Sequence, residues 1–148
     1  MLRFVRELLA DVRRPAGEDE SHRQVRVAVA ALLQKMATAD FSEHPNEQEE
    51  LRLAVRRFLD LQPEEAAEVV EDGRREAVES VSLYDFTEVL HRELDLEQKV
   101  EVVELLWQIA YSDGEIHPQE EHLVRKVAGL LHIPHERFIE AKQRARES

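Results

Sequence analysis

Residues 109–120 read IAYSDGEIHPQE, and residues 36–47 read MATADFSEHPNE. Both segments run from an apolar stretch to an Asp, cross a short acidic turn and continue through His-Pro-x-Glu. The second copy begins 73 residues after the first. A helix that ends, turns and restarts in the same way twice is typical of a duplicated unit. The sequence therefore predicts two pseudo-symmetric helix-turn-helix halves.

The composition predicts an all-α protein. Of 148 residues, 43% are apolar and 35% are charged, which suits one hydrophobic core under a polar surface. Only four Gly and five Pro interrupt a chain rich in helix-forming residues. We expect a single compact helical domain of about seven or eight helices. Residues 1–20 should form an N-terminal amphipathic helix and acidic linker, and residues 21–148 the helical domain.

Apolar residues at helical spacing locate the core helices. A helix up to Asp40 should bury one stripe of Val25, Val29, Leu32 and Met36. The most apolar helix, about residues 97–112, should lie at the centre of the domain and bury Val100, Val103, Leu106, Trp107 and Ala110. Helix starts are expected at Pro63, Pro118 and Pro134, with Ser82 as the N-cap of another helix.

The charge distribution argues against some partners. The net charge is −12, and because residues 1–14 carry +2 and residues 134–148 carry +1, residues 15–133 carry −15. Such a body repels phosphate backbones, so we expect no nucleic acid partner, whereas a cation or a basic protein would suit it. The absence of Cys excludes thiol chemistry and agrees with a cytoplasmic location. Residues 2–13 should pack on their own domain or on a protein partner, with peripheral membrane association as the alternative.

The acidic turn of each repeat is the candidate site. Its carboxylates are Asp113, Glu115, Glu120 and Glu121 in the second copy and Asp40 and Glu47 in the first. Clustered oxygen ligands suit hard divalent cations. The alternative is pure helix capping, because Gly114 can end one helix, Pro118 can start the next and Glu side chains favour a helix N-terminus. Both interpretations stay open, and any cation should be held weakly because exposed charges are screened.

The sequence has no recognisable catalytic motif. Glycines at positions 17, 73, 114 and 129 cannot form a phosphate-binding or dinucleotide-binding loop, and no zincin motif occurs. Glu88-x-x-His91 matches one element of di-iron bundles, so a carboxylate and histidine metalloenzyme or a metal buffer is the alternative function. Those bundles also need Glu side chains that face inward from two other helices. The expected apolar stripes of the helix up to Asp40 and of the helix at about residues 97–112 contain no Glu.

The stretch LLWQIAYSDGEIHPQEEHLVRKVA, residues 105–128, resembles the signature of the TerB-like tellurite-resistance family. The resemblance covers about residues 22–146. It implies an all-helical domain of two similar halves, a link to tellurite or stress response, and kinship with the helical domain of a membrane co-chaperone. It also implies an acidic, metal-binding surface, whose positions fall on Asp113, Glu120, Glu121, Asp40 and Glu47. The family lends no enzyme reaction, so we expect a non-enzymatic binding or scaffold module that acts with a protein partner.

Overall fold

The regular elements of the protein are helices throughout the part of the chain that the structure describes. The computed structural model describes residues 20–37, 49, 51–53, 55–56, 61–79, 82–111 and 116–147. Its helices are α2 (Glu20–Ala37), α4 (Pro63–Glu79), α5 (Leu83–Glu93), α6 (Leu96–Tyr111), α7 (Pro118–Leu130) and α8 (His135–Glu147). The N-terminal helix expected at residues 2–13 and both turns of the repeat, residues 38–48 and 112–115, lie outside the described residues.

The helix starts follow the predicted local signals. α4 begins at Pro63 and α7 at Pro118, where the missing N–H of proline has no helical partner to lose. Ser82 is the N-cap of α5, and its side chain accepts a hydrogen bond from the Tyr84 N–H at 3.1 Å. α8 begins directly after Pro134. These observations confirm the helix starts that the sequence predicted at Pro63, Ser82, Pro118 and Pro134.

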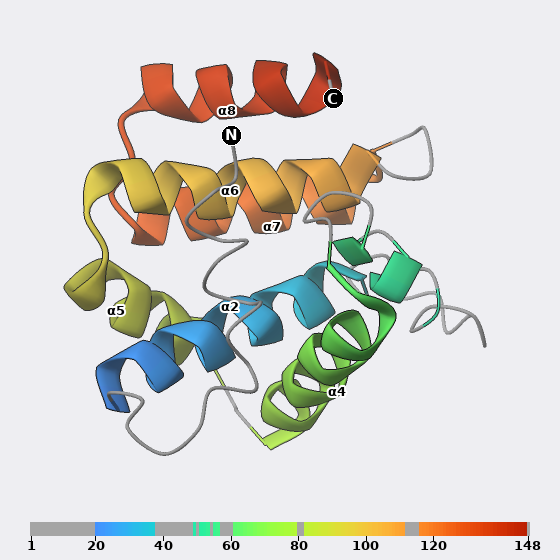
Figure 1. Cartoon of the computed structure of the whole chain (residues 1–148). Helices are drawn as coiled ribbons and strands as arrows, with labels where there is room; N and C mark the ends of the chain where they lie inside the picture. Colours follow the sequence, from blue (N-terminus) through green and yellow to red (C-terminus); the bar gives the residue numbers. More distant parts are fainter. Residues whose placement is uncertain are drawn as a thin grey trace.

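The helix α6 lies at the centre of the domain, as predicted. Every residue from Val102 to Ala110 is buried, and Trp107 is 0% exposed. α6 packs against α2, α7 and α8, and Figure 1 shows α8, α6 and α2 stacked with α5 at one end. A helix covered on all sides needs an apolar surface on all sides, which is why this helix is the most apolar in the chain.

The helix α2 is buried more completely than the predicted stripe. Val25, Val29, Leu32 and Met36 are buried as expected, but so is every residue from Ala28 to Gln34. The reason is that α4, α5 and α6 all pack on α2. α4 approaches most closely at Gly73, where an added Cβ atom would lie only 2.3 Å from the backbone oxygen of Ala30. A side chain at position 73 would therefore push the two helices apart.

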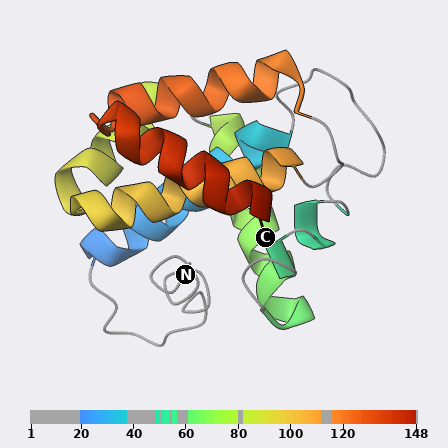
Figure 2. The same ribbon diagram turned by 90° about the horizontal axis from the view of Figure 1, so that it is seen from above.

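The helix α8 runs in the same general direction as α6 and crosses it at an angle (Figure 2). The chain leaves α6, returns along α7 and turns again into α8, which crosses over α6 in the view from above (Figure 2). Arg137 of α8 pairs with Glu97 of α6, and Arg144 pairs with Glu104, both at a separation of 40 residues. The two Glu residues are seven positions apart on α6, and their Arg partners are seven positions apart in the same order on α8. This is possible only when the two helices run in the same direction.

Within the described ranges, none of the helices combines the length and the apolar character needed to cross a membrane.

Candidate functional site

The start of α7 is the described part of the acidic turn. The backbone N–H of His117 donates a hydrogen bond to the Glu120 carboxylate at 3.0 Å, and the N–H of Glu120 donates back to the His117 carbonyl at 3.0 Å. The carboxylate bond is the N3 half of a capping box, which satisfies a donor that the helix itself leaves free. Glu120 is only 8% exposed. The structure thus gives this carboxylate a capping role.

Glu121 is held on the surface of the same helix. Its Oε1 atom accepts hydrogen bonds from Arg125 Nη2 at 3.0 Å and from Arg125 Nε at 3.3 Å, one helical turn further on. Exposed pairs of this spacing add little stability, but they do restrict the side chains that form them. Both described carboxylates of the predicted site therefore have partners that belong to α7 itself.

The other four predicted site residues, Asp113, Glu115, Asp40 and Glu47, lie outside the described residues. Within the ranges that the structure describes, no group of three or more His, Asp or Glu side chains is arranged to hold a metal ion. The described structure thus fixes the helix that follows the turn, and ion binding by the turn stays a prediction.

The histidine of the Glu88-x-x-His91 motif faces a lysine. Glu88 and His91 are both exposed, and His91 Nδ1 lies 2.8 Å from Lys99 Nζ. The His91 ring also lies against His132, with ring centroids 4.6 Å apart. An ammonium group at this distance does not favour a cation on the same ring, so this motif resembles a surface contact more than a metal site.

Glu104 corrects one sequence-based expectation. The apolar stripe of the central helix was expected to contain no inward-facing Glu, but Glu104 of α6 is 1% exposed. Burial raises the pKa of its carboxyl above the ordinary value, while Arg144 at 3.4 Å opposes that shift. Its Oε2 atom has no hydrogen-bond partner among the described residues. Glu104 follows Val100 by four positions and precedes Trp107 by three, so the helical period itself could have identified it.

The second pair between α6 and α8 has the opposite character. Arg137 donates to both oxygens of Glu97, at 2.7 and 2.8 Å, in a bidentate contact at the surface. The hydrogen bond from Arg137 holds the pKa of Glu97 below its ordinary value. The Trp107 ring of α6 also packs against Phe138 of α8, with centroids 5.5 Å apart. The α6–α8 contact therefore joins an aromatic centre to one exposed and one buried ion pair.

Comparisons with known proteins agree with this architecture. The chain is similar to a solved structure of a protein of unknown function from Porphyromonas gingivalis, with a TM-score of 0.58 and 20% identity over 84% of this chain and 95% of that one. At this identity the likeness shows the fold alone. No curated protein matches the chain. The sequence profile of the family described as tellurite resistance protein TerB matches residues 26–143, which span α2 to α8. The chain belongs to the TerB family.

Proposed function

We propose that the protein is a non-catalytic binding module of a tellurite-response or stress-response system. In this proposal the acidic turn between α6 and α7 binds a divalent cation or a basic segment of a partner protein. The observation that carries the proposal is the match of the TerB family profile to residues 26–143. Family membership supports the link to tellurite.

The capping bond divides the candidate carboxylates into two roles. Glu120 is engaged by the backbone and almost buried, so it would position the turn without touching a ligand. Asp113 and Glu115 precede the helix, and together with Glu121 they would supply the oxygen atoms that a hard cation prefers. Asp40 and Glu47 would play the corresponding part in the first copy. Phe41 stands there in place of Gly114, so we expect the second copy to bind more tightly.

The charge of the chain supports a basic partner. Residues 15–133 carry −15, and a surface of this sign attracts cations and basic proteins while it repels nucleic acids. Screening over about 8 Å at physiological salt makes the attraction short-ranged. A cation at the turn would therefore need several carboxylates in direct contact.

Amide NMR during titration with calcium, magnesium or manganese tests the site. We expect saturable shifts, or line broadening with manganese, around residues 113–121 of the wild type and a clear loss in Asp113→Asn. The variant keeps an oxygen for capping and removes the charge, so capping alone would leave its helix start unchanged. Asp85→Asn, at an exposed position of α5, is the matched control. If the wild type showed no saturable shifts, the turn would act as a helix cap alone and the cation proposal would be wrong.

Metal analysis of untagged protein separates this proposal from the alternative. A metal-dependent enzyme or metal buffer would be purified with stoichiometric iron or manganese, whereas a weak binding module would lose its ion during dialysis. In the organism that encodes the chain, deletion of the gene should lower the tellurite concentration that stops growth. Restoration by the wild type and not by Asp113→Asn would connect the turn to that phenotype.

A further inference from the structure

One side of the central helix α6 is buried although none of the described helices packs closely on it. Glu101, Leu105 and Gln108 follow one another at spacings of four and three residues, so they form one stripe along the helix. Leu105 is 0% exposed and Gln108 is 5% exposed, while Glu101 is half-buried. The burial of this stripe therefore needs an explanation.

The helices that pack on α6 lie on its other sides. Trp107 packs on α8, whereas Lys99 contacts His91, whose ring lies at the turn after α7. Lys99 precedes Glu101 by two positions, which is about 200° of helix rotation, so the stripe faces away from Lys99. Figure 1 shows α8 above α6, α2 below it and α7 behind it, and the view from above agrees (Figure 2). The stripe thus faces the viewer of Figure 1, where none of the described helices packs closely on α6.

A buried carboxylate oxygen lies beside this stripe. Glu104 is 1% exposed and precedes Leu105 and Gln108 by one and four positions. Its Oε1 atom pairs with Arg144 at 3.4 Å, but its Oε2 atom has no hydrogen-bond partner among the described residues. A buried carboxylate oxygen without a donor is costly. A positively charged cover on this side of α6 would therefore be favoured over an acidic one.

Residues 2–13 have the properties that such a cover needs. Apolar residues recur in this segment at helical spacing, at Leu2, Val5, Leu9 and Val12. Residues 1–14 carry a net charge of +2, whereas the other stretches outside the described ranges are neutral or negative. A helix of about 12 residues is barely stable alone in water, so it needs a surface on which to pack.

We infer that residues 2–13 cover this side of α6 in the same chain. The segment forms an amphipathic helix whose apolar stripe lies over Leu105 and whose Arg side chains lie along the acidic edge of Glu101 and Glu104. A helix of this length spans about 18 Å, which is enough to cover most of the 16 residues of α6. The inference does not depend on the acidic turn. It assigns the segment to its own domain instead of to a protein partner or a membrane surface.

Paramagnetic NMR on the full chain tests this contact. The chain has no Cys, so Glu7→Cys places one nitroxide label on the polar side of the segment. We expect the amide signals of α6 around Glu101 and Leu105 to lose intensity and to recover when the label is reduced. Asp85→Cys, at an exposed position of α5, is the matched control, and its label should leave these signals unchanged. A mixture of nitroxide-labelled chain and isotope-labelled chain separates a contact within one chain from a contact between two copies.

Substitutions on both sides of the contact sharpen the test. Val5→Asp together with Leu9→Asp removes the apolar contact, so hydrogen exchange at the amides of residues 2–13 should accelerate by roughly tenfold or more. Asp11→Asn, on the polar side of the same segment, should leave these exchange rates close to those of the wild type. Glu101→Lys should weaken the docking by repelling the Arg side chains. Glu136→Lys makes the same charge change at an exposed position of α8 and should have no such effect.

Several outcomes would overturn the inference. Unchanged α6 signals in labelled Glu7→Cys would leave residues 2–13 to a protein partner or a membrane, and intensity loss only in the mixture would mean a second copy. Equal exchange rates in the wild type and in the double variant would also contradict it. Circular dichroism shows whether the helical domain stays folded in each variant. Asp113→Asn should keep the contact, so a failure of the cation proposal and a failure of this one can be told apart.

Discussion

The contact of α2 with α4 and the contact of α6 with α8 are built from different chemistry. In the first, Gly73 removes a side chain so that α4 can lie against the backbone of Ala30. In the second, Trp107 packs against Phe138, and two ion pairs also join the helices. Both are among the most extensive helix contacts in the described part of the protein.

The difference shows that two helix interfaces of one domain can have opposite sensitivities to substitution. An interface closed by a missing side chain is intolerant of any addition, because the obstructing atom is backbone and cannot rotate away. An interface filled by large side chains is intolerant of removal, because the space would be left empty. The ion pairs make the stability of the α6–α8 interface depend on pH, whereas the close approach at Gly73 involves no titratable group. The four predictions below test this contrast.

Truncation of the aromatic centre should have the largest effect. Trp107 is 0% exposed and packs against Phe138, so Trp107→Ala should lower the free energy of unfolding by roughly 3–5 kcal/mol. Chemical denaturation followed by circular dichroism measures this loss. Tyr84→Ala, at an aromatic residue that is 57% exposed, should change stability by about 0.5 kcal/mol or less. Comparable losses in the two variants would contradict the central role of Trp107.

Addition at the glycine contact should have the next largest effect. Gly73→Ala places a methyl group 2.3 Å from the Ala30 oxygen, so the helices must separate, and we expect a loss of roughly 1–3 kcal/mol. The matched control is Gly129→Ala, which meets open space and should gain up to about 1 kcal/mol from helix propensity. Denaturant midpoints of the two variants should therefore move in opposite directions. A gain in both would mean that α4 does not need this close approach.

The buried carboxyl of Glu104 should make the free energy of unfolding fall as pH rises. Burial raises the pKa of Glu104 in the folded state, so its contribution is present below the unfolded value of about 4.5 and is lost as pH rises through the folded pKa. Glu104→Gln removes this cost, and its stability relative to the wild type should increase from pH 4 towards neutral pH. Denaturation midpoints across that range measure the trend. A constant difference would show that Arg144 compensates the buried charge fully.

The exposed ion pair should give the smallest effect and the opposite pH dependence. The hydrogen bond from Arg137 lowers the pKa of Glu97, so its contribution is present above the unfolded value and is lost as pH falls through the folded pKa. Glu97→Gln should be slightly less stable than the wild type at neutral pH, and the difference should vanish in acid. High salt screens the exposed pair, so the same midpoint series repeated at high salt should give a smaller difference. The sharpest form of the comparison is the stability of each Glu→Gln variant relative to the wild type, which should change with pH in opposite directions for Glu104→Gln and Glu97→Gln.

Much of the fold was predictable because its signals are local. Pro63, Pro118 and Ser82 start helices for reasons that lie within one turn of the chain, and the apolar run around Trp107 could only be satisfied at the centre. The all-round burial of α2 was not predictable from its own period, since it depends on three other helices. Gly73 likewise has no local signal, because its role depends on Ala30, a residue 43 positions away.

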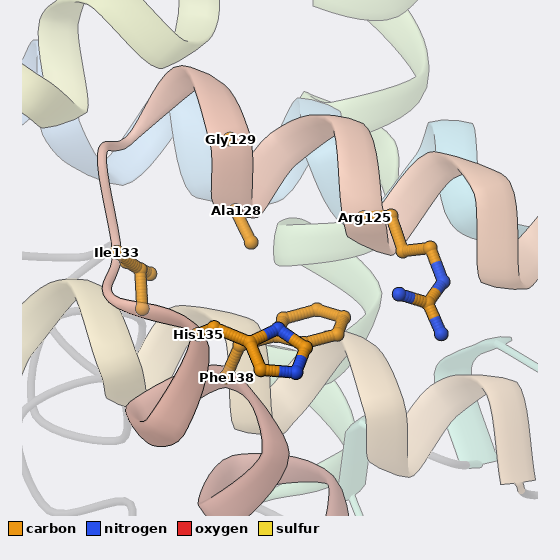
Figure 3. A pocket seen from close by; sticks show the side chains of 6 residues that line it. All are labelled: Arg125, Ala128, Gly129, Ile133, His135 and Phe138. Atoms are coloured by element: carbon orange, nitrogen blue, oxygen red, sulfur yellow. The ribbon is translucent and has the colours of Figure 1, made fainter.

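The candidate site was predictable only in its residue types. The sequence identified Glu120 as a helix-starting residue or an ion ligand, and the structure gives it a capping bond. A small hollow between the end of α7 and the start of α8 (Figure 3) was not predicted, because its lining residues Arg125, Ile133 and His135 come together only through the left-handed turn at His132. Glycine is the residue that usually marks a left-handed helix end in a sequence. Because histidine stands at this position, neither periodicity nor turn residues could indicate the turn.

The contact between Lys99 and His91 also determines a proton position. An ammonium group can only donate, so the Nδ1 atom of His91 must be the acceptor, and the neutral ring then carries its hydrogen on Nε2. That single tautomer links α5 to α6, and through the His132 ring it reaches the turn that precedes α8. The orientation of one imidazole ring thus joins three elements of the fold that are far apart in the sequence: α5, α6 and the turn before α8.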